Sequence, residues 1–314
     1  MLISIIISAF NSSLFIEETL NSIKIQTWKK LELIITDDCS TDDTTVVCQN
    51  WLKENRERFI NATLLKSNIN TGVSANANRG LKIAKGDWIK FLGADDTLKP
   101  ACIEENMSWI ASHPEIKVLF SKIEVYKETF EPQNLINTIP GDPYNPESIL
   151  ASNRSAESQY KMLLINDRVH FSPSVFLHRE TIVSLGGFDE RFKLLEDYPM
   201  WLNLTKKGFK LFFFDKITVN YRRHSKAINN TGLKCIINPN YFNSEIFRKI
   251  YIYPNLNTDS WLNARFIWYT SQIFRIKYFN KYNKRNSILH SILTIGLNPF
   301  RYLFWLKTKL KDKE

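Results

Sequence analysis

The sequence predicts an α/β fold in which a mostly parallel sheet is flanked by helices, followed by a helical, basic and aromatic C-terminal extension. Short β-branched apolar runs alternate with segments of helical periodicity through the first third of the chain, which is typical of right-handed βαβ units. Acidic pairs stand directly after two of these runs. The basic character of the extension follows from its charge. Residues 261–314 hold 11 Lys and Arg against 2 Asp and Glu, a net charge of +9, whereas the whole chain has a formal net charge of +10.

The first part of the chain is expected to hold four strands and three helices. The strand runs are rich in Ile and Leu, as expected for strands covered on both faces. Clusters of Asn, Ser, Thr and Asp indicate helix starts, since their side chains can cap a first turn. The expected strands are 3–8, 31–36, a short one at 64–65, and 88–92; the expected helices are 14–25, one capped by 40–43 that runs through Trp51, and 73–84.

The rest of the chain is expected to be less regular. Four prolines in a polar stretch at 127–160 predict a long surface loop. An acceptor side is expected from about residue 165, and a catalytic domain of 1–230 is expected to precede a helical region of 231–314. The expected strands are 175–177, 211–214 and 218–221; the expected helices are 180–185 and one that begins at or just after 196–197 and ends near 208.

Composition limits the class of protein. With 44% hydrophobic and 24% charged residues, the chain is globular, which excludes a disordered or collagen-like protein. The apolar stretch 1–10 has no basic flank and is expected to be a strand rather than a secretion signal. The sequence has no uninterrupted run of about 18 apolar residues, so we expect no membrane-spanning helix. Four cysteines without a CxxC pair or metal-ligand spacing predict free thiols in a reducing compartment.

Two acidic pairs, Asp37-Asp38 and Asp95-Asp96, follow predicted strands. Ligands of open α/β sheets bind beyond the carboxyl ends of the strands. The first turn, residues 10–13, contains no glycine, which argues against the pyrophosphate cradle of a dinucleotide enzyme. Carboxylates without such a cradle predict a site in which a divalent cation bridges carboxylate to phosphate. Solvated loops with capping roles are the alternative.

A third acidic element is Glu196-Asp197. Negative charge at a helix N-terminus complements the helix dipole, and this is the simpler of two roles. The other role is a general base that faces the same cleft. From the residues alone both stay open. Trp201, one helical turn further on, is expected to pack in the core, with stacking on a sugar ring as the alternative.

Eight short segments form an ordered set along the chain: 4–11 (SIIISAFN), 23–27 (IKIQT), 33–43 (LIITDDCSTDD), 72–80 (GVSANANRG), 84–86 (AKG), 91–96 (FLGADD), 185–190 (LGGFDE) and 195–201 (LEDYPMW). In order and spacing they resemble glycosyltransferase family 2, in particular the bacterial O-antigen and capsular polysaccharide glycosyltransferases. Any one motif is weakly specific, whereas five in order are a strong signal. The resemblance extends over about residues 1–225.

The resemblance implies a GT-A fold and an enzyme of the hexosyltransferase type. It implies inverting transfer of a sugar from a nucleoside diphosphate sugar to a hydroxyl of a glycan acceptor. Uridine is the expected nucleoside, because a carboxylate can accept a hydrogen bond from the uracil N–H, an edge that thymine shares. The expected acceptor is a lipid-linked oligosaccharide in surface polysaccharide biosynthesis. The alternatives are a nucleotidyltransferase on a similar sheet, or a non-catalytic sugar- or nucleic-acid-binding protein.

The resemblance also implies roles on the donor side. Phe10 stands where the family stacks an aromatic ring on the nucleobase, with Ser8 beside it. Asp38 stands where a carboxylate reads the edge of the base. The arginine that the family often uses for the diphosphate is replaced by alanine here. We therefore expect its contact to come from Arg79 or Arg222.

By the same resemblance, Asp95 is expected to approach the ribose, and Asp96 to bind the divalent cation, Mn²⁺ or Mg²⁺, that holds the diphosphate. The family usually has an aspartate where this chain has Gly93, so support of the metal ligand is expected to be weaker. His224 lies in a segment that resembles the loop closing over the diphosphate, and it either ligates the metal or belongs to a basic surface. Asp197 is the expected catalytic base.

The basic extension interleaves aromatic and cationic side chains from Trp261 to Trp305. Such a segment suits one or two amphipathic helices on an anionic membrane, with residues 261–314 as the docking region. Ordinary helical packing with a basic face is the alternative. Nucleic acid is disfavoured as a partner, because no nucleic-acid motif accompanies the charge. The expected location is the cytoplasm, peripheral on the cytoplasmic face of the inner membrane.

Overall fold

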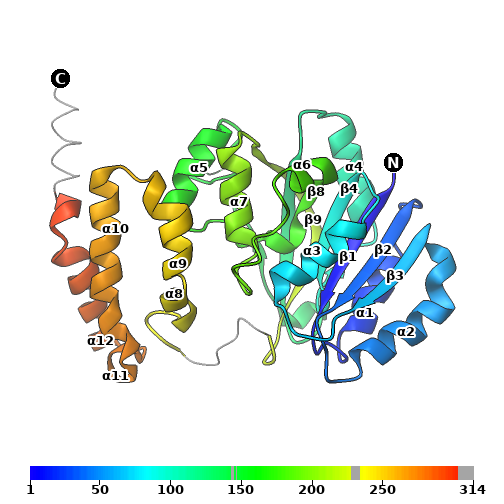
Figure 1. The fold of residues 1–314 in the computed structure, drawn as a ribbon, viewed down its shortest axis with the longest axis horizontal. Helices are drawn as coiled ribbons and strands as arrows, with labels where there is room; N and C mark the ends of the chain where they lie inside the picture. Colours follow the sequence, from blue (N-terminus) through cyan, green and yellow to red (C-terminus); the bar gives the residue numbers. More distant parts are fainter. Residues whose placement is uncertain (143–144, 146, 228–233, 303–314) are drawn as a thin grey trace. The chain divides into compact units, whose positions relative to one another are not determined.

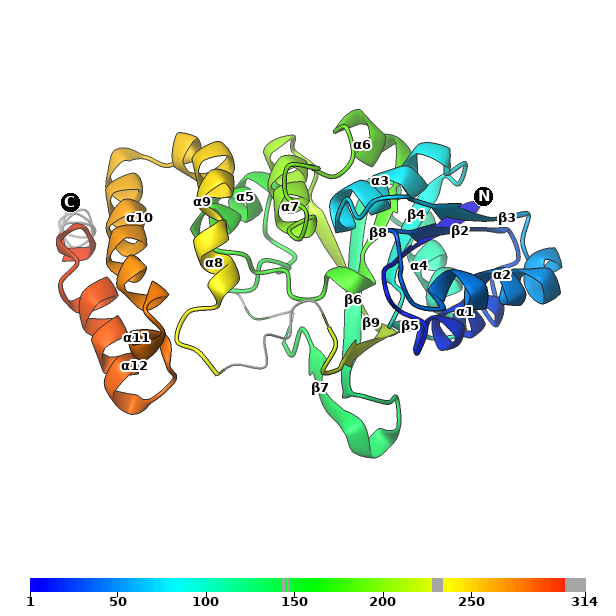
Figure 2. The ribbon, with the colours of Figure 1, turned by 60° about the horizontal axis from the view of Figure 1, so that its bottom comes forward.

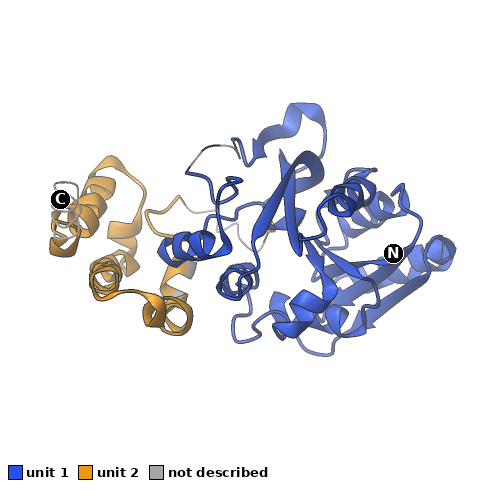
Figure 3. Ribbon diagram, turned by 90° about the horizontal axis from the view of Figure 1, so that it is seen from above, with its two compact units in different colours: residues 1–225 blue, residues 226–314 orange. Residues whose placement is uncertain are grey.

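The computed structural model describes residues 1–142, 145, 147–227 and 234–302. The chain divides into two compact units, Met1–Ser225 and Lys226–Glu314, against a predicted boundary at 230/231 (Figure 3). The first unit is an α/β domain, as predicted, and the second is helical. The acidic pairs singled out by the sequence all belong to the first unit.

Within the described residues of the first unit, nine strands form one mixed sheet (Figure 1). The strands are β1 Ile3–Ala9, β2 Leu31–Asp37, β3 Asn61–Lys66, β4 Trp88–Gly93, β5 Thr97–Leu98, β6 Val118–Lys127, β7 Leu135–Ile139, β8 Phe176–His178 and β9 Leu211–Arg223. Their order is β3-β2-β1-β4-β8-β6-β9-β5, with β7 paired to β6. β1 to β4 are parallel to one another, as predicted, and β6 is parallel to β9. The pairings of β5, β7 and β8 are antiparallel, so the sheet is less parallel than expected.

Helices cover both faces of the parallel half of the sheet. The helices of the described part of the first unit are α1 Ile16–Lys24, α2 Thr44–Asn55, α3 Val73–Ile83, α4 Cys102–Ala111, α5 Ala156–Ile165, α6 Arg179–Ser184 and α7 Asp197–Lys206, with 3₁₀ turns η1 Arg56–Arg58, η2 Pro132–Asn134 and η3 Ser172–Ser174. α1 and α2 lie on one face and α3 on the other, as right-handed crossovers require when the chain runs from β1 out to β3 and back to β4 (Figure 2). α1 buries Ile16, Leu20 and Ile23, which share one helical face.

The register of the parallel strands defines the edge at which polar residues gather. β1 and β2 consist largely of Ile and Leu and are almost wholly buried, because helices cover both of their faces. Ala9 of β1 lies beside Asp37 of β2, and Ser8 lies beside Gly93 of β4. The residues that follow these three strands therefore leave the sheet at one common edge.

The stretch 127–160, expected to be a long loop, is partly ordered. β7 pairs antiparallel with β6, and this hairpin stands out from the sheet (Figure 2). The prolines indicated a loop, but the Ile- and Thr-containing segment between Pro132 and Pro140 pairs with β6. Pro140 directly follows β7, a position at which a missing amide donor does not interrupt a ladder.

The strands expected at 211–214 and 218–221 are parts of the single strand β9. The polar residues Asp215 and Lys216 lie between the two expected strands. Instead, the register of β9 against β6 shifts at this point, and Asp215 forms an ion pair with Lys122 of β6. A bulge therefore absorbs the polar residues without ending the strand.

The second unit is built from short helices. They are α8 Pro239–Asn243, α9 Glu245–Phe247, α10 Thr258–Ser271, α11 Lys277–Asn280 and α12 Lys284–Ser291, with π-helical turns η4 Arg248–Ile252 and η7 Ile292–Gly296 and 3₁₀ turns η5 Tyr253–Asn255 and η6 Gln272–Arg275. Ile237, Phe242 and Phe274 form its buried cluster. Among the described residues, no helix is both long enough and apolar enough to cross a bilayer.

Part of the interleaved basic and aromatic pattern serves packing inside the second unit. The guanidinium of Arg248 lies over the rings of Tyr241 and Trp268, at 4.6 and 5.7 Å from their centroids. Arg265 similarly lies 4.7 Å from the ring of Tyr269. Arginine stacked on an aromatic face is favourable even near solvent. The alternative of ordinary helical packing therefore accounts for several of these residues.

Candidate active site

The turn after β1 presents Phe10 at the edge where the strands end, with its side chain 38% exposed. Ser8 lies partly buried just before it. Asn11 Oδ1 accepts a hydrogen bond from the amide of Thr41 at 2.8 Å, and the amide of Asn11 donates to Ser40 Oγ at 2.9 Å. These bonds tie the turn after β1 to the turn after β2. Phe10 is thereby held as an exposed ring above the strand ends.

Asp38 is buried and anchors the loop that precedes α3. Its oxygens accept hydrogen bonds from the amides of Thr71 and Gly72, at 3.0 and 2.7 Å, and from the Thr71 hydroxyl at 2.9 Å. Arg79 Nη2 donates to Oδ1 at 2.7 Å. Burial raises the pKa of Asp38, but Arg79 and the other donors outweigh it, and the pKa lies below its usual value. A carboxylate offers about four acceptor positions, and these donors occupy them.

The same contacts determine where Arg79 points. Besides Asp38, its guanidinium donates to Thr71 Oγ1 and to Asn76 Oδ1, each at 2.7 Å. The structure therefore brings the expected base-reading carboxylate and the expected diphosphate ligand together as partners of one another. The hydrogen bond between Arg79 and Asp38 would have to break before both side chains contacted a nucleotide.

The turn after β4 carries two adjacent carboxylates. Asp96 is 2% exposed, and its Oδ1 accepts a hydrogen bond from the backbone amide of Arg222 at 2.9 Å. Asp95 is more open, and its Oδ2 lies 3.0 Å from His224 Nε2. Burial, and then the charge of Asp95, raises the pKa of Asp96 well above its usual value.

Asp95 and Asp96 are adjacent carboxylates, and His224 bonds to the first of them. Two adjacent carboxylates, one of them buried, repel each other, and a divalent cation would remove that excess charge. Carboxylate oxygens and imidazole are acceptable ligands for Mn²⁺, and carboxylate oxygens for Mg²⁺. Nowhere in the described ranges do three His, Cys, Asp or Glu side chains form a group that could hold a metal ion by itself. Oxygens from a substrate would have to complete the coordination.

Arg222, on β9, is 3% exposed and supports this turn. Its Nε donates to the carbonyl of Asp95 at 2.8 Å, and its Nη2 pairs with Glu18 of α1. The guanidinium lies between the rings of Phe15 and Phe130, at 4.8 and 4.0 Å from their centroids. This differs from the expected diphosphate contact, because a guanidinium enclosed by rings and bonded to protein oxygens has little left to offer a phosphate. Arg222 instead fixes the turn that carries Asp95.

Asp197 is the first residue of α7 and is partly buried. Its Oδ2 accepts a hydrogen bond from Ser172 Oγ, and its Oδ1 accepts one from the amide of Tyr198, both at 2.7 Å. Burial raises the pKa of Asp197, and these two bonds oppose the rise. A side chain oriented by a distant turn, η3, is more than a charge at a helix N-terminus, which favours the general-base role.

Glu196 and Asp167 lie close to Asp197. Burial, and then the charge of Asp197, raises the pKa of Glu196 to about 7 and that of Asp167 to about 6. Acids that titrate near neutrality are typical of proton-transfer sites. Sequence reasoning missed Asp167, because it stands alone in a polar stretch and only the fold brings it to Asp197.

Tyr221, on β9, connects the two acidic groups. Burial raises its pKa to about 12, and the charges of Asp96, Asp95 and Asp197 act in the same direction. The η3 turn, whose Ser172 bonds to Asp197, packs against β4 and against β9, whose Arg222 amide bonds to Asp96. The structure therefore brings the carboxylates after β4 and the start of α7 to one site, although they are far apart in the sequence.

The segment 185–195, which leads to Asp197, is docked on α3. Asn78 Nδ2 donates to the Phe188 carbonyl, and the Phe188 amide donates to Asn78 Oδ1, both at 2.8 Å. Gly187 has a φ of +77°, and a Cβ there would lie 2.5 Å from Asn78 Oδ1. Glycine is thus required for a close approach to the helix. The LGGFDE motif is the part of the chain that docks the base-bearing segment.

Lys90 is a second residue that sequence reasoning missed. It lies fully buried in β4, and its Nζ donates to the carbonyl oxygens of Pro173, at 2.6 Å, and Val175, at 3.3 Å. Burial lowers its pKa to about 8. The available signal was a lysine inside an otherwise apolar strand run, Trp88–Gly93, where an unpaired charge would be costly.

Trp201 packs in the core, as expected. It is 1% exposed, and its ring meets that of Phe120 edge to face at a centroid distance of 5.0 Å. It is therefore not available to stack on a sugar. The thiols of Cys39, Cys48, Cys102 and Cys235 are free.

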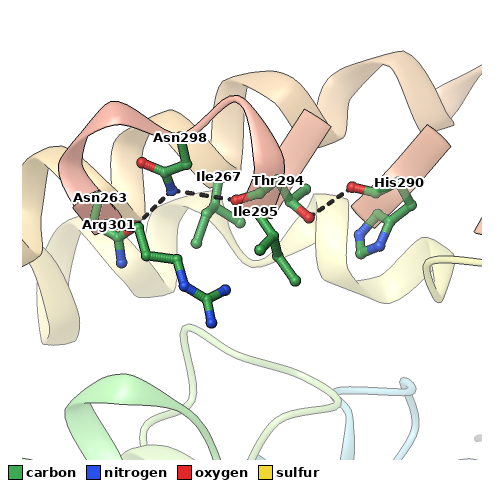
Figure 4. Close-up of a pocket in the computed structure, with 7 residues that line it drawn as sticks. All are labelled: Asn263, Ile267, His290, Thr294, Ile295, Asn298 and Arg301. Carbon is green, nitrogen blue, oxygen red and sulfur yellow. Dashed lines mark hydrogen bonds between the residues drawn. The ribbon is translucent and has the colours of Figure 1, made fainter. Parts of the chain in front are cut away.

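The second unit contains a pocket of about 250 Å³ that has a different chemistry (Figure 4). Its lining residues are Asn263, Ile267, His290, Thr294, Ile295, Asn298 and Arg301. The amide of Asn298 is fully buried, and its Nδ2 donates to Asn263 Oδ1 at 2.6 Å and to the Thr294 carbonyl at 3.2 Å. The lining has no acidic residue, and its ionisable side chains are His290 and Arg301.

Comparisons with known proteins indicate the family and the fold of the chain. The family described as glycosyl transferase family 2 matches residues 4–177. A GalNAc(5)-diNAcBac-PP-undecaprenol beta-1,3-glucosyltransferase of Campylobacter jejuni is 38% identical over 222 residues, which are 70% of this chain and 64% of that protein. WfaP of Escherichia coli, a UDP-Glc:alpha-D-GlcNAc-diphosphoundecaprenol beta-1,3-glucosyltransferase, is 31% identical over 75% of this chain and 83% of its own length. The crystal structure of S. aureus TarS 1–349 in complex with UDP-GlcNAc shares the fold, with a TM-score of 0.60 and 18% identity over 95% of this chain and 82% of that one.

Proposed function

The chain belongs to glycosyl transferase family 2, and from this premise we propose that it moves a sugar from a uridine diphosphate sugar to a hydroxyl of a lipid-linked glycan, with inversion. The observation that carries the proposal is that η3, whose Ser172 orients Asp197, packs against β4 and β9, the strands that carry and hold Asp95 and Asp96. Inverting transfer requires a carboxylate that can bind a cation at the leaving diphosphate and a separate base for the acceptor. This arrangement can supply both.

In this proposal Asp197 is the catalytic base. Its carboxylate takes the proton of the acceptor hydroxyl while that oxygen attacks the anomeric carbon and the bond to the diphosphate breaks. The raised pKa of Asp197 increases its basicity, and Ser172 orients it. A single displacement inverts the anomeric centre, so the protein forms no covalent bond to the sugar.

On the donor side, Phe10 and Ser8 support the nucleobase, and Asp95 approaches the ribose. The exposed ring of Phe10 suits stacking on a flat base. Asp38 reads the base when its carboxylate accepts a hydrogen bond from the uracil N–H in place of the one from Arg79. The same exchange frees the Arg79 guanidinium to turn toward the diphosphate, which is how two residues that pair in this structure serve one nucleotide.

Asp96 and His224 are the proposed protein ligands of a divalent cation, Mn²⁺ or Mg²⁺. When bound, the cation neutralises the charge that develops on the departing diphosphate. Arg222 holds the Asp95-Asp96 turn rigid through the Asp95 carbonyl and the bond from its amide to Asp96. This support substitutes for the aspartate that the family usually has at the position of Gly93.

The names of the two relatives describe acceptors linked through diphosphate to undecaprenol. We extend this to a lipid-linked acceptor, reached from the cytoplasmic face of the inner membrane by docking of residues 261–314 on anionic lipid. Ile288, Ile292 and Ile295 are 46–51% exposed and recur at the spacing of one helical face on α12 and η7. Exposed aromatic and basic side chains from the same part of the chain are Tyr278, Tyr282, Lys277, Lys281 and Lys284.

The central experiment is transfer from a panel of nucleotide sugars to an undecaprenyl diphosphate-linked sugar. The expected product besides the glycoside is a nucleoside diphosphate. Asp197→Asn should lower turnover about 10³-fold, the usual range for a general base, while Mn²⁺-dependent binding of UDP persists. Glu157→Gln, which alters an exposed carboxylate of α5, is the control and should be neutral. Unchanged turnover of Asp197→Asn would exclude it as the base, and release of pyrophosphate would indicate nucleotidyl transfer instead.

Membrane docking is tested separately by flotation with vesicles of phosphatidylglycerol or phosphatidylcholine. Binding should require the anionic lipid and weaken as salt is raised. The triple variant Ile288→Ser, Ile292→Ser and Ile295→Ser should release the protein. Ile60→Ser with Ile69→Ser, which changes exposed isoleucines of the first unit, should not. Equal flotation of the two variants would refute docking through residues 261–314.

A further inference from the structure

We propose that Lys90 is a positioning residue that acts on Asp197 through the η3 turn. The inference rests on the proposed role of Asp197 as the base. Lys90 lies in β4, the strand that leads to Asp95 and Asp96, and its ammonium is buried inside the protein. What it touches is the backbone of the turn that orients Asp197.

Lys90 is connected to Asp197 by two hydrogen bonds and the backbone that joins Ser172 to Pro173. Lys90 Nζ donates to the Pro173 carbonyl at 2.6 Å, and Pro173 directly follows Ser172, whose hydroxyl donates to Asp197 Oδ2 at 2.7 Å. A second bond from Nζ to the Val175 carbonyl, at 3.3 Å, holds the other end of the turn. Fixing these two carbonyls fixes the direction in which Ser172 points.

The cost of burying a lysine supports a specific role. A fully buried ammonium loses its hydration, and an apolar residue of similar volume would fill the same space more cheaply. Among the described residues nothing acidic forms an ion pair with Lys90, and its ammonium bonds to two carbonyl oxygens at the η3 turn. A lysine is therefore kept where its main effect on structure is to hold η3.

A double-mutant cycle tests the route. Lys90→Met keeps the stem and removes the donor, and Ser172→Ala removes the hydroxyl that orients Asp197. Each should lower kcat about tenfold, as expected for one lost hydrogen bond, and leave KM for the donor within about twofold. If Lys90 acts through Ser172, the double variant should be no slower than the slower single variant. Lys122→Met, which removes a lysine of neighbouring β6 that pairs with Asp215, is the matched control and should keep kcat.

Multiplying losses in the double variant would overturn the proposal, since they would mean independent routes. A loss of Mn²⁺–UDP affinity in Lys90→Met as large as its loss of kcat would also overturn it, by assigning Lys90 to Asp96 instead. Should Lys90→Met not fold, Lys90→Gln, with an amide donor on a shorter stem, takes its place.

A readout without any sugar separates this inference from the proposed reaction. In Lys90→Met, hydrogen exchange should accelerate at the amide of Val175, which closes η3, and at that of Tyr198, which donates to Asp197. Unchanged exchange at both amides would contradict the positioning role. If the wild type transfers no sugar but this acceleration is seen, the proposed function fails while the link from Lys90 to Asp197 stands.

Discussion

The two acidic groups of the site are held in different ways. Asp95 and Asp96 follow the end of β4 after one residue, Ala94, so the register of the strand brings them to the edge of the sheet. Asp197 follows a segment that is docked on α3 by Asn78, and its carboxylate is oriented from η3. The first group thus depends mainly on local chain geometry, and the second on contacts between distant parts of the chain. Substitutions remote from the chemistry should therefore disturb Asp197 more readily than Asp96.

The largest effect is expected from Asp96→Asn, which removes the proposed cation ligand. Transfer should fall about 10³-fold or more, because charge on the leaving diphosphate is no longer neutralised. Isothermal titration should show that UDP binding loses its dependence on Mn²⁺, whereas Asp197→Asn keeps it. Without ligands, Asp96→Asn should unfold at a higher temperature than the wild type, because a buried carboxylate beside Asp95 is gone. Mn²⁺-dependent UDP binding of wild-type strength would contradict the assignment.

Arg222→Met tests how far the metal-side group also depends on distant contacts. The change leaves the Asp95 carbonyl without its donor and removes a cation stacked between two rings, so unfolding should cost about 3 kcal/mol less. Urea unfolding measures the loss, and titration should show weaker Mn²⁺–UDP binding. Arg223→Met alters the adjacent, exposed arginine and should stay within about 0.5 kcal/mol of wild type. Equal stability of the two variants would mean that Arg222 is dispensable for the turn.

Asn78→Ala tests the docking of the base-bearing segment. Two hydrogen bonds to Phe188 are lost, which should reduce the free energy of unfolding by about 1–2 kcal/mol. We expect kcat to fall about tenfold and Mn²⁺–UDP affinity to stay unchanged, since β4 is untouched. Gly187→Ala should reproduce the effect by forcing the same contact apart, and Asn50→Ala on exposed α2 should be neutral. A fall in UDP affinity without a fall in kcat would contradict this expectation, because it would mean that the docked segment supports Asp95 and Asp96 rather than Asp197.

The smallest effect is expected from pH. The pKa of Glu196 is raised from 4.5 to about 7, so between these values the folded state holds a proton that the unfolded state releases. This contribution to stability is complete below about pH 4.5 and is lost as pH rises through about 7. Glu196→Gln should therefore flatten the pH dependence of the unfolding free energy between pH 5 and 8 by an amount on the order of 1 kcal/mol. Parallel curves for variant and wild type would show that burial does not perturb Glu196.

Much of the first half of the fold follows from the sequence because its signals are local. Apolar runs of the right length, capping residues and acidic pairs all lie within a few positions of the elements that they describe, and β1 to β4 are found where they were expected. The hairpin of β6 and β7 and the continuity of β9 were missed, because pairing with a remote strand outweighs prolines and charged residues in the local pattern.

By itself, the sequence determined the α/β class, the edge of the sheet at which carboxylates gather and, through its ordered motifs, the enzyme family. The tertiary structure alone decided the partners of these side chains. It paired Asp38 with Arg79, enclosed Arg222 between two rings, and connected Lys90 to Asp197 through η3. The physical reason is that backbone periodicity and capping depend on neighbours along the chain, whereas hydrogen-bond partners and desolvation depend on which distant residues the fold brings within a few ångströms.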